Sequence, residues 1–213
     1  RSTAPPHPPV WCPPGAAPRA ALQDHRADTA AERFWRAQLA GFTTPVGPPP
    51  DRRGPSDTAP GQDVGRHELE VSPQATVALQ AAAQRARVTL NTLVQGAWAL
   101  LLTRYAGQED VVFGVTLSGR PAGLDGVEDM VGMFVNSLPV RVGVEASAPV
   151  DDWLRTLQAR NVALRQFEHS SLARVQSWSG LPHGTPLFPT LVVFENYPSA
   201  GALVPVGAGV RVE

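Results

Sequence analysis

Hydrophobic residues recur with two different spacings between residues 29 and 194 of the chain. Residues 66–71 alternate apolar and charged side chains, which is the period of a half-buried strand. Residues 111–117 form an almost continuous apolar run rich in β-branched residues, which is typical of a strand covered on both faces. Residues 134–144 and 187–194 are two further strand candidates, each interrupted by one proline, Pro139 and Pro189.

Four other stretches place apolar residues at helical spacing, and they are residues 29–39, residues 73–87, residues 91–105 and a stretch that begins at Pro149. The first has Thr29 as its predicted N-cap and Glu32 three residues later, the layout of a capping box. The third is apolar nearly all round, which predicts a helix buried in the core. Strands that alternate with helices predict an α/β fold with a mixed sheet flanked by helices.

Prolines mark the parts of the chain outside this pattern. Seven of the first twenty residues are proline, so residues 1–27 are predicted to be a disordered proline-rich segment. A second stretch rich in proline, glycine and aspartate, residues 43–65, predicts an irregular connection. The 213 residues therefore hold one folded region, which we place at residues 28–213.

Charge and cysteine content exclude several classes of partner. The chain has 18 basic and 19 acidic residues and a net charge of −1, and every basic residue is a scattered arginine. No basic stripe is available for nucleic acid or an anionic membrane, and no apolar run approaches the roughly 20 residues that span a bilayer. The single cysteine, Cys12, suits a reducing compartment. We therefore expect a cytoplasmic protein without nucleic-acid or membrane partners.

Motifs for common catalytic chemistries are missing from the sequence. It contains no G-x-S-x-G nucleophile motif and no glycine-rich phosphate loop between a strand and a helix. Its five histidines are never spaced like the ligands of a metal-binding helix. The residues alone thus predict no metal site and no complete catalytic group.

Five individual positions remain to be interpreted. The position of His169 is compatible with two roles, a general base or an ordinary histidine at the end of a helix or in a loop. Arg120 directly follows the predicted buried strand, where α/β proteins carry functional loops, but it also fits a solvated loop arginine. Asn136 and Ser137 interrupt an apolar strand, so they either line a cavity or bond neighbouring backbone. Trp178 is interpreted as a packing residue.

Three segments together carry a recognisable family pattern. They are residues 113–141, which contain SGRP and VEDMVGMFVNSLPVR, residues 169–180, which begin with HSSL, and residues 186–198, which read PLFPTLVVFENYP. This pattern resembles the condensation domains of nonribosomal peptide synthetases, in the chloramphenicol-acetyltransferase-like superfamily. The resemblance covers about residues 29–198.

The resemblance implies one lobe of a two-lobe fold. Such domains join an acyl or peptidyl thioester to the amine of an aminoacyl thioester. Both substrates arrive on phosphopantetheine arms of peptidyl carrier proteins, and no cofactor is bound directly. The histidine motif of the family belongs to the amino-terminal lobe and is absent here, so residues 28–213 are interpreted as a partial domain, mostly the carboxy-terminal lobe. Its expected partners are carrier proteins, the amino-terminal lobe and other synthetase domains.

The resemblance also assigns roles to particular residues. Arg120, with Ser118 and Gly119, matches the lobe-interface position that holds the aspartate of the histidine motif. A second group matches the wall and floor of the substrate tunnel, and it consists of Gly132, Met133, Phe134 and Asn136. No residue of this chain is assigned a catalytic role, so we expect the chain alone to form no amide bonds.

Two alternatives stay open. The epimerising, cyclising and ester-forming branches of the superfamily fit the same motifs. A noncatalytic module that docks carrier proteins, or the remnant of a synthetase, fits the missing histidine motif. Because an isolated lobe exposes an apolar face and a sheet edge, we also expect it to self-associate or to be marginally stable.

Overall fold

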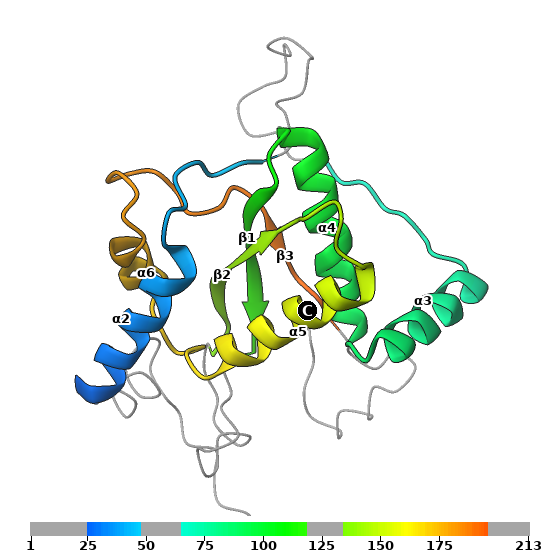
Figure 1. The fold of residues 1–213 in the computed structure, drawn as a ribbon, viewed down its shortest axis with the longest axis horizontal. Coiled ribbons are helices and arrows are strands. Elements are labelled where there is room, and N and C mark those ends of the chain that lie inside the picture. Colours follow the sequence, from blue (N-terminus) through cyan, green and yellow to red (C-terminus); the bar gives the residue numbers. More distant parts are fainter. Residues whose placement is uncertain (1–24, 48–64, 119–133, 196–213) are drawn as a thin grey trace, which may run out of the picture.

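Helices flank a small sheet in the computed structural model, which describes residues 25–47, 65–118 and 134–195 (Figure 1). In chain order the elements are α2 (His25–Leu39), α3 (Pro73–Ala86), α4 (Leu90–Ala106), β1 (Asp110–Leu117), β2 (Asn136–Gly143), α5 (Val150–Arg165), α6 (Leu172–Trp178) and β3 (Leu191–Val192). The predicted α/β class is confirmed.

The sheet is mixed, as the sequence predicts. Its strand order is β2-β1-β3, with β1 in the centre. β2 runs antiparallel to β1, with Leu117 opposite Asn136, whereas β3 runs parallel to β1, with Gly114 opposite Leu191. Pro139 is tolerated within β2 because β2 lies at the edge of the described sheet.

The core forms where the central strand meets the helices. The side chains of Val111, Val112 and Phe113 in β1 are fully buried, as predicted for a strand covered on both faces. α4 packs against β1 and α5, while α6 packs against α2 and β2, so α2 and α6 lie together on the β2 side of the molecule (Figure 1). Ala99 and Leu102 of α4 are completely buried, which confirms the predicted core helix.

Side-chain N-caps begin both α3 and α4. Ser72 accepts a hydrogen bond from the Ala75 amide, and Thr89 accepts one from the Thr92 amide. The predicted N-cap at Thr29 is wrong, because α2 begins at His25 and Thr29 lies inside it. Glu32 forms an ion pair with Arg36 at 2.8 Å, one helical turn away.

Three other elements differ from the prediction. Residues 66–71 form no strand within the described part of the chain. They are exposed along their whole length, with Leu69 82% exposed. Of the last predicted strand, residues 187–194, only Leu191–Val192 form a strand. Pro189 restricts its start, and β3 lies at the edge of the described sheet with Leu191 exposed. The short helix α6 was not predicted from the hydrophobic pattern.

Gly114 permits the close approach of the chain beside β1. A Cβ added here would lie 2.8 Å from Cδ1 of Leu191 and closer still to the ring of Phe188. We expect Gly114→Ala to lower the free energy of unfolding by about 1–3 kcal/mol, because the neighbouring side chains must move to relieve the overpacking. Urea unfolding measures the change. Gly143→Ala is the matched strand control, because a Cβ there meets nothing within 4 Å; equal losses in both variants would contradict the expectation.

Candidate functional site

The carboxyl end of β1 and the start of β2 form the base of the connection that carries most of the predicted site residues. Because Leu117 lies opposite Asn136, the two strand ends that flank residues 119–133 lie side by side. Ser118 is exposed at one end, and Phe134 is buried at the other. The other predicted residues lie outside the described part of the chain, and they are Gly119, Arg120, Gly132 and Met133.

Asn136, the first residue of β2, is hydrogen-bonded to the turn that follows α5. Its side-chain Nδ2 donates hydrogen bonds to the backbone oxygens of Glu168, at 2.7 Å, and Ser170, at 2.8 Å. Its Oδ1 accepts a bond from the Ser137 amide at 3.0 Å. The sequence left two roles open for Asn136, lining a cavity or bonding nearby backbone. In the structure its side-chain amide bonds nearby backbone groups. Its assignment to a substrate tunnel stays a prediction.

Two aromatic residues of α2 fix the same turn from the other side. The Nε1–H of Trp35 donates to the Ser170 hydroxyl oxygen at 3.0 Å, in a buried contact. The ring of Phe34 stacks on Phe167, with centroids 4.4 Å apart. The turn over residues 166–170 is therefore held between α2 and the start of β2.

His169 lies half-buried in this turn, between the two residues whose carbonyls bond Asn136. Sequence spacing gave no sign that His169 and Asn136 share one place in the fold. The general-base interpretation of His169 remains a prediction. Trp178, by contrast, packs against the core cluster, as expected.

A second polar group, which the sequence analysis missed, lies near the same end of β1. The Nδ2 of Asn161 donates to Gln95 Oε1 at 2.9 Å, and the Nε2 of Gln95 donates to Asn91 Oδ1 at 3.1 Å, which links α5 to α4. These amides line a hollow of about 30 Å³ together with Val115 and Leu117, room for one or two waters. The sequence feature that could have indicated this group is the pair Asn91 and Gln95, two amides four residues apart on a mostly apolar helix.

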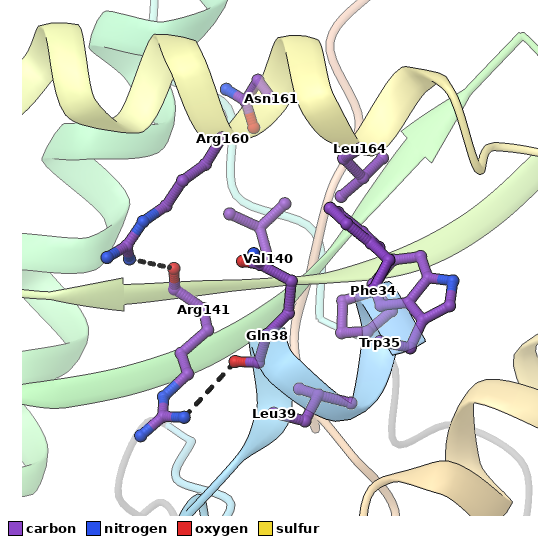
Figure 2. A pocket seen from close by; sticks show the side chains of 10 residues that line it. Phe34, Trp35, Gln38, Leu39, Val140, Arg141, Arg160, Asn161 and Leu164 are labelled. Carbon is purple, nitrogen blue, oxygen red and sulfur yellow. Dashed lines mark hydrogen bonds between the residues drawn. The ribbon is translucent and has the colours of Figure 1, made fainter. Parts of the chain in front are cut away.

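A smaller hollow lies where α2, β2 and α5 meet (Figure 2). Its volume of about 10 Å³ is too small for a substrate. Beside it, Arg141 NH1 donates to the backbone oxygen of Gln38 at 3.3 Å, and Arg160 NH1 donates to the backbone oxygen of Arg141 at 3.0 Å. This region joins three elements and has a structural role.

The described residues contain neither a cluster of metal ligands nor a membrane-spanning helix. Across residues 25–47, 65–118 and 134–195, histidine, cysteine, aspartate and glutamate nowhere gather in a group of three that could hold a metal ion. Over the same ranges, none of the helices has the length and apolar character needed to cross a bilayer.

Comparison with known proteins identifies the family. The family model "Condensation domain" matches residues 18–204. The chain therefore belongs to the condensation domain family. It is 50% identical over 171 residues to one of the subunits of linear gramicidin synthase from Brevibacillus parabrevis, and the match covers 79% of this chain and 2% of that protein. It is 45% identical over 176 residues to chondramide synthase cmdD of Chondromyces crocatus, covering 83% of this chain and 4% of that protein.

Solved structures show the same fold. The X-domain from teicoplanin biosynthesis is 28% identical with a TM-score of 0.66, and the match covers 81% of this chain and 38% of that one. The first condensation domain of the CDA synthetase is 19% identical with a TM-score of 0.68, covering 85% of this chain and 38% of that one. The chain thus spans only a few per cent of the curated relatives' length and well under half of these solved chains.

Proposed function

We propose that this chain is one lobe of an amide-forming condensation domain. The observation that carries the proposal is the pairing of Leu117 with Asn136, which places the two strand ends that flank the SGRP-containing segment at one end of the sheet. The 50% identity to a gramicidin synthase supports the same assignment. In this proposal Arg120 faces a second lobe, and the segment from Gly132 to Asn136 borders the substrate tunnel.

In the proposed reaction, the substrates are an acyl or peptidyl thioester and an aminoacyl thioester, each on the phosphopantetheine arm of a carrier protein. The amine nitrogen attacks the thioester carbonyl, a C–N bond forms, the C–S bond breaks, and the thiol leaves with the proton that the amine loses. We assign this chain positioning rather than proton transfer. Holding the two thioesters in one tunnel lowers the entropic part of the barrier.

A complementation assay tests the proposal. The chain is mixed with a separately expressed amino-terminal lobe that carries the histidine motif, both loaded carrier proteins are supplied, and the amide product is followed by mass spectrometry. We expect product from the mixture and none from the chain alone. Arg120→Ala is expected to abolish the product, because the ion pair between the lobes is lost.

Arg104→Ala provides the matched control, because Arg104 is an exposed arginine in the last turn of α4. Product formation should be unchanged in this variant. Product from the chain alone, or equal activity of the Arg120 and Arg104 variants, would contradict the assigned roles.

A noncatalytic docking module is the second candidate. The observation in its favour is the likeness to the teicoplanin X-domain, which at 28% identity exceeds the 19% of the CDA condensation domain. That X-domain has also been solved in complex with OxyB. Association of this chain with the amino-terminal lobe or a carrier protein, without any amide product, would favour the docking module.

A further inference from the structure

A chain of three side-chain amides crosses the contact between α4 and α5. Asn161 Nδ2 on α5 donates to Gln95 Oε1 at 2.9 Å, and Gln95 Nε2 donates to Asn91 Oδ1 at 3.1 Å. Gln95 is only 3% exposed, although α4 is otherwise mostly apolar. Burying an amide costs free energy that apolar packing does not, so stability alone does not explain this polar chain.

The two ends of the amide chain differ in chemistry. Because each amide donates in the same direction, Asn91 Nδ2 remains as a donor at one end and Asn161 Oδ1 remains as an acceptor at the other. Neither atom has a hydrogen-bond partner within residues 25–47, 65–118 and 134–195. In those same ranges no buried side-chain nitrogen or oxygen lacks a partner, so both end atoms are accessible.

Both ends line the hollow of about 30 Å³ at the carboxyl end of β1. This volume accommodates about two polar atoms, which are either two waters or the oxygen and nitrogen of one amide group. Leu117, which also lines the hollow, directly precedes the SGRP segment. The hollow therefore adjoins the candidate functional site.

A neighbouring group of hydrogen bonds fixes α4 against α5. Gln158 Oε1 on α5 accepts from the Thr92 hydroxyl at 2.6 Å and from the Thr89 amide at 3.1 Å, at the start of α4. Gln158 lies about one helical turn before Asn161, so these bonds hold Asn161 opposite Gln95. A site held in place in this way loses less conformational entropy when a ligand binds.

We propose that this hollow binds the secondary amide group of a substrate. Asn91 Nδ2 donates to the amide oxygen, and Asn161 Oδ1 accepts from the amide N–H. The donor and the acceptor come from different helices, which favours a group with two separate polar atoms over a single hydroxyl. An uncharged group fits because no carboxylate lines the hollow to bind a cation.

The source of the amide rests on the proposed function. The thioesters of that reaction offer secondary amides in two places, the pantetheine arm and the peptidyl chain. Both sources present the same chemistry to Asn91 and Asn161. The experiment therefore compares a probe for each.

An NMR titration of the isotope-labelled full chain tests the proposal, with the side-chain amide signals of Asn91, Gln95 and Asn161 as the readout. The probes are the methyl thioether of pantetheine and N-acetylglycine N-methylamide, a model of the peptidyl chain. We expect saturable shifts of these signals with at least one probe, and the tighter probe identifies the source. Absence of any shift with both probes would show that the hollow holds water only, which overturns the proposal.

Asn91→Asp removes the free donor but keeps an oxygen that can accept from Gln95. Its negative charge in the first turn of α4 favours the helix, and circular dichroism checks that the variant is folded. We expect probe binding to weaken about tenfold, because one hydrogen bond to the ligand is lost. Gln74→Glu is the matched control, because Gln74 is exposed and is the second residue of α3, as Asn91 is of α4.

The control variant should bind like the unmodified chain. Equal binding by Asn91→Asp and the unmodified chain contradicts the proposal, as does an equal loss in Gln74→Glu. The acceptor is tested without a substitution, by methylating each amide nitrogen of the tighter probe. This probe has no N–H for Asn161 and should bind about tenfold more weakly, so equal binding would also overturn the proposal. These titrations need neither a second lobe nor turnover, so their failure is distinguishable from a failure of the complementation assay.

Discussion

Replacing Trp35 with alanine is expected to lower the free energy of unfolding by about 3–5 kcal/mol, the largest loss we expect from a single substitution here. The side chain is 1% exposed and belongs to the core cluster of α2, the sheet and α5. It also contacts the Phe34 ring edge-on, with centroids 5.1 Å apart. Its removal leaves a cavity and frees the Ser170 hydroxyl that it bonds.

Urea unfolding followed by far-ultraviolet circular dichroism measures this change. Trp35→Phe separates the two contributions, because it keeps most of the buried ring but loses the hydrogen bond to Ser170. We expect it to cost about 1–3 kcal/mol. A loss below about 1 kcal/mol for the alanine variant would show that this region does not fold as described.

Replacing Arg141 with alanine is expected to cost about 2–3 kcal/mol, because several charge-assisted hydrogen bonds are lost together. The guanidinium bonds both carboxylate oxygens of Asp110, with NH2 2.7 Å from Oδ2 and Nε 3.0 Å from Oδ1. Its NH1 donates to the backbone oxygen of Ala40 at 2.6 Å, just beyond α2. The arginine side chain is only 22% exposed, so water replaces these bonds poorly.

Arg36→Ala is the control for Arg141→Ala, since its ion pair with Glu32 lies on the exposed surface of α2. It should cost no more than about 0.5 kcal/mol. Arg141→Lys keeps the charge but cannot bond both carboxylate oxygens as a planar fork, so it should fall between the two. Equal effects of Arg36→Ala and Arg141→Ala would contradict the assigned role of Arg141.

The sequence predicted well those elements whose local pattern agrees with their place in the fold. β1, α4 and α5 have long apolar patterns and clear end signals, and all three are present. Residues 66–71 show the limit of this reasoning, because alternation alone does not supply a partner strand. β3 has the apolar pattern of a buried strand, but its position at the edge is set by pairing with a distant segment.

The candidate site was predicted only in part for the same reason. Asn136 stood out as a polar residue in an apolar strand, but its bonds reach residues more than thirty positions further along the chain. The amides of Gln95 and Asn161 meet only because α4 packs against α5. Contacts of this kind depend on tertiary packing, which no local spacing encodes.

The parallel pairing of β3 with β1 also has a kinetic consequence. The connection between β1 and β2 is the shorter one, whereas the contact of Gly114 with Leu191 closes a longer loop that contains β2, α5 and α6. Closing the longer loop costs more entropy, so β3 should dock after α4, β1, β2 and α5 have assembled. During that interval the apolar stretch from Leu191 to Phe194 has both edges unpaired, and the nascent chain is then most prone to misassembly.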